Sequence, residues 1–356
     1  MKNKVIIPAG YMGSGSSAIT DLISEIDGYD NKNGSFEYVF MHCPGGFFDL
    51  EDKLLIGNNA LRSDEALHTF YYTMKNLYEN KHYWVADYSN KMGIDFLYLI
   101  EDFLNKIIDN KFKDTYWYYQ ENPNTKVYIK KFINKILKLI SAGKIISKPG
   151  KRYEEMWVSY VTSEDFYKES KLFLNNFFDE MGLIDNNIIL DQFLLPHNLF
   201  RIDRYFDDNV KIIVVERDPR DIFLLNKYYW NMANCPVPYP FDVKEFCTYY
   251  RKMRNLENIT SNKNILRIRF EDLVYNYEDE INKIYYFLSV DSHLHKRIRT
   301  NFIPEKSITN TQIFMKNNKF KSESDYIFKN LNEFIYDFPY YDESIITEAN
   351  LILWHL

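Results

Sequence analysis

Glycine and serine residues near the amino terminus have the spacing of a phosphate-binding loop. An apolar run, Val5–Ile7, leads into Gly10-x-x-x-x-Gly15-Ser16-Ser17, and a helical pattern of apolar residues follows it. A turn of this kind between a strand and a helix directs successive backbone N–H groups and the positive end of the helix dipole toward an anion. The segment therefore predicts a strand, an anion-binding loop and a helix. The apolar residues of that helix are Ile19, Leu22, Ile23 and Ile26.

This spacing matches a Walker A loop except at Ser16, where that motif has lysine. The Walker lysine reaches the β- and γ-phosphates of a nucleoside triphosphate. A loop without it is expected to hold a shorter phosphate group rather than ATP for hydrolysis.

A second candidate anion site follows the apolar run Lys211–Val215. The segment Glu216-Arg217-Asp218-Pro219-Arg220-Asp221 comes directly after it, and Pro219 suits the first turn of a helix. Arg217 would then lie at the carboxyl edge of a sheet, where open α/β sheets bind ligands, and a planar guanidinium suits bidentate phosphate recognition. In the alternative interpretation Asp218 and Asp221 merely neutralise the two arginines.

The order of three motifs resembles the sulfotransferase family that uses 3′-phosphoadenosine 5′-phosphosulfate (PAPS). The glycine-serine loop comes first, Arg217–Asp221 second, and Arg269-Phe-Glu-Asp-Leu273 third, before an amphipathic helix. The resemblance covers residues 1–30 and roughly 185–320. It implies a central parallel sheet with helices on both faces and a P-loop, and a reaction that transfers a sulfonate group from PAPS and leaves 3′-phosphoadenosine 5′-phosphate.

The resemblance also implies the cofactor-binding residues. The loop would hold the 5′-phosphosulfate, Arg217 the 3′-phosphate, and a later loop would close over the nucleotide. The family lysine of the first loop aligns with Gly13, and the family serine that helps bind the 3′-phosphate aligns with Leu225, beside Asn226. The candidate contacts are Gly13, Ser14, Gly15, Ser16, Ser17, Ala18, Arg217, Asn226, Ser307, Asn310 and Lys316.

Sulfonate transfer to an alcohol also needs a base near the acceptor hydroxyl. In many relatives the base follows a middle strand, which here would be Ile188–Leu190. Asp191 stands at the end of that strand, and His197 lies six residues further on with a suitable pKa. His42 is a third candidate, ranked behind Asp191 and His197.

Four apolar runs are expected to be buried strands separated by helices, which is the alternation typical of a parallel sheet. These runs are Val5–Ile7, Asn187–Leu190, Lys211–Val215 and Ile265–Phe270. Between about Leu50 and Met181 no strand is expected. Helical, aromatic segments such as Ala66–Tyr78 and Phe96–Ile108 occupy that region instead. We therefore expect one domain, 1–356, with a mainly helical acceptor-recognition insertion at about 50–181.

The segment Lys126–Arg152 contains nine basic residues and no acidic one. Ile129, Phe132, Ile133, Ile136 and Ile140 would form one apolar helix face. The alternatives are a solvated helix packed on the domain, a dock for an anionic acceptor, or a dock for a membrane surface.

Composition excludes several classes of protein. A net charge of −6 argues against a general nucleic-acid binder. The cysteines Cys43, Cys235 and Cys247 have no metal-ligand spacing and are expected to be reduced thiols. The histidine pattern predicts no metal site. No signal peptide or transmembrane segment is expected, which favours a cytoplasmic protein.

The favoured function is a PAPS-dependent O-sulfotransferase acting on a hydroxyl of a glycan or of an apolar alcohol such as a sterol or lipid. The sequence does not decide between these acceptors, nor does it indicate an oligomeric state. The alternatives are a P-loop nucleotide kinase or NTPase, which the absent Walker lysine disfavours, and a non-catalytic nucleotide-binding protein.

Overall fold

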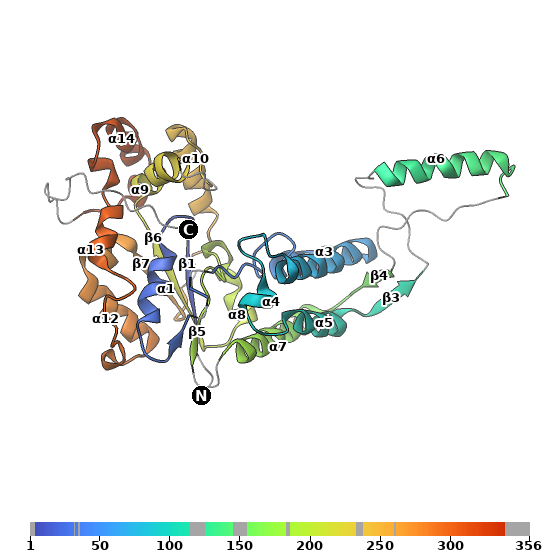
Figure 1. The fold of residues 1–356 in the computed structure, drawn as a ribbon, viewed down its shortest axis with the longest axis horizontal. Helices are drawn as coiled ribbons and strands as arrows, with labels where there is room; N and C mark the ends of the chain where they lie inside the picture. Colours follow the sequence, from blue (N-terminus) through green and yellow to red (C-terminus); the bar gives the residue numbers. More distant parts are fainter. Residues whose placement is uncertain are drawn as a thin grey trace.

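The computed structural model describes residues 4–31, 33–34, 36–113, 125–144, 155–182, 186–232, 238–259 and 261–338. A five-stranded parallel sheet lies at its centre, with the strand order β2-β5-β1-β6-β7 (Figure 1). The strands are β1 (Val5–Gly10), β2 (Tyr29–Asp30), β5 (Asn187–Ile189), β6 (Val210–Glu216) and β7 (Ile265–Arg269). All four predicted strands are present, and β2 is an addition too short to leave a hydrophobic pattern.

The two faces of the sheet pack against different cores because side chains alternate along each strand. On β6, Ile212 and Val214 belong to one buried cluster, while Ile213 and Val215 belong to the other. The central strands are buried on both sides, which explains why they read as continuous apolar runs. The predicted α/β fold, with helices on both faces of a parallel sheet, is confirmed.

One face is covered by helices from both ends of the chain. These are α1 (Ser16–Ser24), α11 (Phe270–Tyr275) and α12 (Tyr277–Leu288). Beyond β6 and β7 a third apolar cluster joins α9 (Pro219–Leu224), the π-helix η2 (Leu225–Trp230), α10 (Val243–Asn255) and α14 (Lys321–Asn330). Short helices complete this side: α13 (Pro304–Ser307), η3 (Ser292–Leu294), η4 (Ile308–Asn310), η5 (Ile313–Met315), η6 (Asn318–Phe320) and η7 (Asn332–Phe334).

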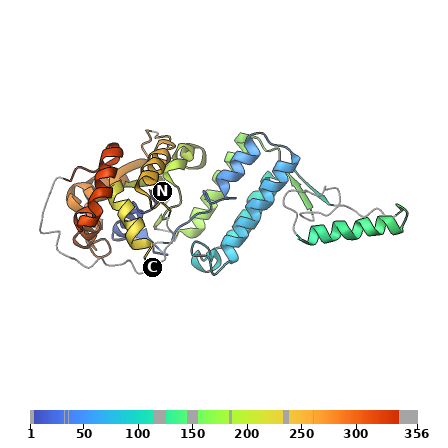
Figure 2. The ribbon, with the colours of Figure 1, turned by 90° about the horizontal axis from the view of Figure 1, so that it is seen from above.

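The other face packs against a helical lobe, which occupies the middle of the molecule in both views (Figures 1 and 2). Its interior is rich in phenylalanine rings. The lobe consists of α2 (Phe47–Leu55), α3 (Ala60–Glu79), α4 (Tyr88–Lys91), α5 (Phe96–Ile107), α7 (Ser163–Met181), η1 (Pro196–Arg201) and α8 (Ile202–Tyr205).

The expectation that this region contains no strand is wrong. An antiparallel hairpin of β3 (Asn110–Lys113) and β4 (Glu155–Val158) extends from the lobe. All four residues of β3 are exposed, so no alternation of apolar and polar residues marked it in the sequence. Beyond the hairpin, at the end of the molecule farthest from the sheet, lies α6 (Thr125–Ile140) (Figures 1 and 2).

Within the described ranges, no helix combines the length and the apolar character needed to cross a bilayer. Cys43 and Cys247 are free thiols. Cys235 lies outside the described residues, as do Lys148, Lys151 and Arg152 of the predicted basic segment.

Candidate functional site

The predicted anion-binding loop connects β1 to α1. Gly13 and Gly15 both have positive φ, at 79° and 98°, a conformation that glycine adopts without a steric penalty. No side chain caps the amino terminus of α1. The N–H of Ala18 donates to the Gly15 carbonyl oxygen, whereas the N–H groups of Ser16 and Ser17 have no acceptor among the described residues. Ser14 is buried, and its Oγ has no hydrogen-bond partner among the described residues. The loop therefore presents unpaired donors, as an anion site requires.

Two aromatic rings explain why the loop needs these glycines. A Cβ on Gly13 would lie 2.4 Å from the indole of Trp230, and one on Gly15 would lie 2.8 Å from the ring of Phe270. The place of the family lysine is thus filled by Trp230, which packs over the loop. Sequence analysis did not identify this residue, because nothing local connects it to the loop.

Arg217 reaches the loop, as the sequence predicts. Its Nη1 donates to the Gly13 carbonyl oxygen at 3.0 Å, and its Nη2 donates to the carbonyl oxygen of Asn310. The guanidinium is 4.9 Å from the centre of the Phe270 ring, and only 5% of the residue is exposed. Its Nε is buried without a hydrogen-bond partner among the described residues, and burial lowers its pKa.

The acidic residues near Arg217 are occupied elsewhere. Asp218 pairs with Arg220, at 2.7 Å, and also accepts from the backbone of Tyr336. Asp221 accepts from the backbone N–H groups of residues 312 and 313, and Glu271 accepts from the N–H of Asp218. No described carboxylate lies within ion-pair distance of Arg217. Asp218 therefore forms a direct ion pair with Arg220, whereas Asp218, Asp221 and Glu271 act on Arg217 only through their charges at longer range.

The segment predicted to close over the nucleotide lies beside Arg217. Asn310 contributes its backbone carbonyl to the Arg217 guanidinium. Lys316 donates to the carbonyl oxygen of Thr309; burial lowers its pKa, Asp221 opposes that effect and the charge of Arg217 adds to it. Ser307 is half-buried at the end of α13. The loop, Arg217 and this segment are thus brought together.

Asn226 lies in the π-helix that follows α9. It is fully buried, and its Nδ2 donates to the carbonyl oxygen of Tyr239, whose hydroxyl donates to the carbonyl oxygen of Met12 at the loop. Its Oδ1 has no partner among the described residues. The π-helical turn shifts the side-chain register that an α-helix would have, and such turns often occur at functional sites.

Asp191 lies beneath the loop. It is 2% exposed, and burial, followed by the charge of Glu37, raises its pKa to about 7, while the hydroxyls of Thr20, Ser16 and Ser17 oppose that rise. Neither carboxylate oxygen of Asp191 has a hydrogen-bond partner of normal distance and angle among the described residues. Burial also raises the pKa of Glu37, to about 7. The buried carboxyl group of Asp191 thus lies next to the helix that begins the anion site, within the electrostatic influence of the half-buried Glu37.

The other two candidate bases have different surroundings. Nε2 of His42 lies 2.8 Å from the Gln192 carbonyl oxygen, and the Gln192 side chain donates to Ser16 Oγ at 2.7 Å. Burial lowers the pKa of His42, which favours its neutral form. His197 instead lies with its Nε2 3.1 Å from the carbonyl oxygen of Met253, and its ring meets that of Tyr11 edge-on. His42 therefore adjoins the loop through Gln192, a residue that sequence analysis did not single out.

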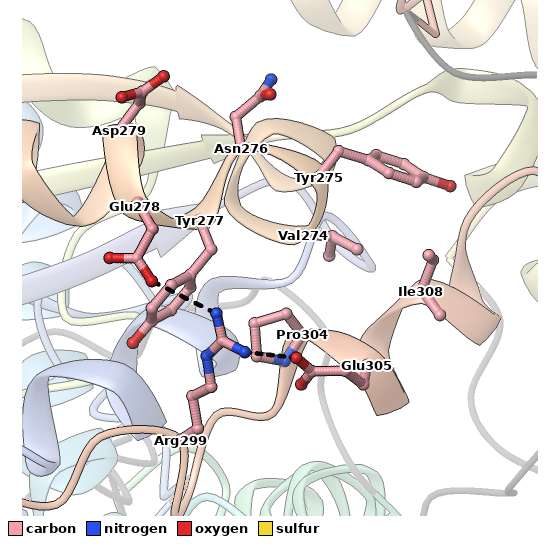
Figure 3. Close-up of a pocket in the computed structure, with 10 residues that line it drawn as sticks. All are labelled: Val274, Tyr275, Asn276, Tyr277, Glu278, Asp279, Arg299, Pro304, Glu305 and Ile308. Carbon is pink, nitrogen blue, oxygen red and sulfur yellow. Dashed lines mark hydrogen bonds and ion pairs between the residues drawn. The ribbon is translucent and has the colours of Figure 1, made fainter.

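A pocket of about 320 Å³ opens at the start of α12 (Figure 3). The guanidinium of Arg299 spans it and pairs with Glu278 at 3.4 Å and with Glu305 at 2.5 Å. None of the predicted site residues lines this pocket, and its lining is net acidic, with the carboxylates of Glu278, Asp279 and Glu305 around the single guanidinium of Arg299. This pocket is therefore separate from the group formed by the loop, Arg217 and the segment around Lys316. The described residues contain no group of three or more His, Cys, Asp or Glu side chains arranged to hold a metal ion.

The sequence matches the family model described as "Sulfotransferase domain" over residues 192–333. This range contains Arg217, the Arg269–Leu273 motif and the segment with Ser307 and Lys316, and it begins after the phosphate loop. The match confirms the resemblance to sulfotransferases that the motifs indicate. None of the curated proteins matches this chain.

Two solved structures have a weak overall similarity to this chain. The sulfotransferase domain of the Synechococcus PCC 7002 olefin synthase is 14% identical, with a TM-score of 0.38 over 95% of this chain and 98% of that one. A retinol dehydratase solved with androsterone and the inactive cofactor PAP is 13% identical, with a TM-score of 0.33 over 94% of this chain and 82% of that one.

Proposed function

We propose that this chain, a sulfotransferase by its family match, transfers a sulfonate group from PAPS to a hydroxyl group of an acceptor. PAPS carries a phosphosulfate at one end and a separate phosphate on its ribose, so its site needs two groups of anion-binding donors. The loop at Gly13–Ser17 would provide one group and Arg217 the other.

The observation that carries this proposal is the buried guanidinium of Arg217. A buried charge normally has an ionic partner, since the cost of removing it from water is large. Arg217 has two backbone carbonyl partners, an unpaired Nε and no carboxylate within ion-pair distance in the described part of the chain. An anionic ligand group at this position would supply a direct ionic partner, in addition to the longer-range charges of Asp221, Glu271 and Asp218.

We further propose Lys316 as the cation that replaces the family lysine. Position 13 cannot carry a side chain while Trp230 packs there, so the charge must come from another element. Lys316 is partly buried, and the positive charge of Arg217 lowers its pKa. Its amine would neutralise the phosphate that leaves during transfer.

The base would come from the residues beside Ser16. Asp191 adjoins Ser16, whose hydroxyl group lowers the pKa of the Asp191 carboxyl group. His42 adjoins Ser16 through Gln192, whose backbone carbonyl lies beside the His42 ring and whose side chain donates to Ser16 Oγ. His197 contacts Met253 instead, so we place it behind the other two. The acceptor remains a glycan or an apolar alcohol, and the aromatic helical insertion at about 50–181 is our proposal for the region that recognises it.

Calorimetry on the full chain tests the proposal with Arg217→Ala. Charge-assisted hydrogen bonds contribute about 1.5–3 kcal/mol, so affinity for 3′-phosphoadenosine 5′-phosphate should fall by roughly 10- to 150-fold. Arg217→Lys keeps the positive charge but not the bidentate guanidinium, so it should lose less nucleotide affinity than Arg217→Ala. Arg251→Ala is the control, because this arginine forms a partly exposed ion pair with Glu333. Equal affinity in wild type and Arg217→Ala would remove Arg217 from the site.

The same measurement distinguishes the kinase alternative, which the position of Asp191 next to Ser16 and Ser17 favours. Binding of ATP that is tighter than binding of 3′-phosphoadenosine 5′-phosphate would support a kinase or NTPase. Sulfonate transfer assayed on saccharides and sterols would then identify the acceptor. Tight binding of the nucleotide with no transfer to any acceptor would indicate a non-catalytic binding protein.

A further inference from the structure

The helix α6 makes few contacts with the rest of the molecule. It lies beyond the β3–β4 hairpin in both views, away from the sheet and the helical lobe (Figures 1 and 2). Every side chain of α6 that the structure describes is exposed, except that of Asn134, which is half-buried. Packing on the domain, the first alternative for this segment, therefore does not account for its apolar residues.

One face of α6 is apolar and open to solvent. Its side chains recur at the three- and four-residue spacing of a helix, so they form a continuous stripe. No other described helix has more than one large apolar side chain that is exposed. Apolar patches of this kind mark interaction sites. The members of the face and their exposed fractions are Tyr128 59%, Ile129 55%, Phe132 65%, Ile133 49%, Ile136 39%, Leu137 38%, Leu139 74% and Ile140 79%.

The remainder of the helix is basic. Residues 125–144 include six lysines and no aspartate or glutamate. On a helical projection Lys131 and Lys138 lie opposite the apolar face, while Lys130 and Lys135 lie along its two borders. Lysines at the borders can extend their ammonium groups to the level of a charged surface while their methylene groups cover apolar area.

We infer that α6 docks on an anionic lipid surface, lying in the plane of the interface with its apolar face toward the acyl chains. A large apolar face combined with a lysine-rich polar face is the pattern of interfacial helices. The sixteen residues of α6 are too few to span a bilayer, which agrees with the absence of a membrane-spanning helix among the described residues.

Charge decides between this partner and two others. A second copy of the same helix would bring lysines against lysines along both borders, with no acidic residue on α6 to pair with them. A soluble anionic polymer such as a sulfated glycan would satisfy the lysines and leave the apolar face in water. An anionic bilayer satisfies both faces at once.

Vesicle co-sedimentation of the full chain tests the inference. We expect binding to vesicles made of equal parts phosphatidylglycerol and phosphatidylcholine, and much weaker binding to phosphatidylcholine alone. The double variant Phe132→Ser/Ile136→Ser should abolish binding to both. Tyr286→Ser is the matched apolar control, since Tyr286 is 89% exposed on α12 and should not affect binding.

A second variant isolates the electrostatic contribution. Each lysine near an anionic surface contributes roughly fivefold to binding, so Lys130→Gln/Lys135→Gln/Lys138→Gln should weaken partitioning by roughly 100-fold. Lys252→Gln/Lys321→Gln/Lys329→Gln removes the same charge from exposed sites elsewhere and should have a much smaller effect. Raising the salt concentration should weaken binding of the wild type more than binding of the first triple variant, which keeps three of the six lysines of residues 125–144.

Three outcomes would overturn the inference. These are equal binding of wild type and Phe132→Ser/Ile136→Ser, equal binding to neutral and anionic vesicles, and a wild-type dimer that the same double variant converts to monomer without any vesicle binding. Circular dichroism of each variant checks that the fold is retained. Because vesicle binding is measured without nucleotide, its failure would leave the proposed sulfonate transfer untouched.

Discussion

The helical lobe and the region around the phosphate loop differ in what they bury. The helical lobe is an apolar interior in which phenylalanine rings contact one another, as Phe103 contacts Phe47, Phe70, Phe166 and Phe173. The region around the phosphate loop buries six polar atoms without partners among the described residues, against four in or beside the lobe, which are Asn58 Oδ1, Glu169 Oε2, Ser170 Oγ and Arg201 Nε. The six atoms around the loop are Ser14 Oγ, both carboxylate oxygens of Asp191, Gln192 Oε1, Arg217 Nε and Asn226 Oδ1.

Packing in the lobe should therefore govern the stability of the fold, and the polar atoms around the loop should govern ligand binding. Unpaired buried polar groups cost free energy, and native proteins keep few of them. Their concentration around one loop is typical of a site whose ligand completes the hydrogen bonds. The lobe should therefore tolerate changes in the ligand site, and the ligand site should tolerate losses of packing in the lobe, as long as the protein remains folded.

The largest expected effect is on the lobe. Phe103→Ala removes a ring that is 1% exposed, and such truncations cost about 3–5 kcal/mol because a cavity remains. Chemical denaturation should show this loss, while the affinity for 3′-phosphoadenosine 5′-phosphate stays the same under conditions where the variant is folded. Phe103→Leu, which leaves a smaller cavity, should lose less stability. A fall in nucleotide affinity in the folded variant would mean that packing in the lobe is coupled to ligand binding at the loop.

The next prediction compares one glycine from each region. Gly15 and Gly57 both have positive φ, so an alanine at either position costs about 1–2 kcal/mol in backbone strain. At Gly57 the added Cβ meets nothing within 4 Å, whereas at Gly15 it meets Phe270. Calorimetry should therefore show that Gly15→Ala lowers nucleotide affinity by roughly tenfold or more, which is about 1.4 kcal/mol. Gly57→Ala should change stability only, and equal affinities in the two variants would show that the loop conformation does not matter.

The predictability of the two regions follows from the same physics. The strands around the loop were predicted because they are buried on both faces, and the loop because its conformation demands glycine at fixed positions. Trp230, Gln192 and Glu37 could not be predicted, since they reach the loop only through tertiary packing. The β3–β4 hairpin was missed because its exposed strand lacks a buried side that would enforce alternation.

The smallest expected effect concerns the charge of Asp191. Its pKa lies near 7, far above the ordinary value of 3.8, so the buried carboxyl group is largely neutral below pH 7 and becomes negative above it. A negative charge beneath the loop repels an anionic nucleotide. If nucleotide binding raises the pKa of Asp191 by about one unit, the affinity for the nucleotide should fall by roughly tenfold as the pH rises through this range.

Asp191→Asn should remove that dependence and bind the nucleotide more tightly than wild type at pH 8, while the two proteins bind alike at pH 6. Comparing them at each pH cancels the ionisation of the nucleotide itself. Glu37→Gln should reduce the pH dependence of nucleotide affinity without removing it, because Glu37 titrates in the same range and acts on Asp191 through its charge.

The free energy of unfolding gives an independent measurement of the Asp191 pKa. A carboxyl group whose pKa is raised by folding destabilises the folded protein increasingly as the pH rises from its ordinary value to 7. Asp191→Asn should therefore gain free energy of unfolding relative to wild type at pH 8 and much less at pH 4, and identical pH profiles of stability would contradict the assignment of the raised pKa to Asp191.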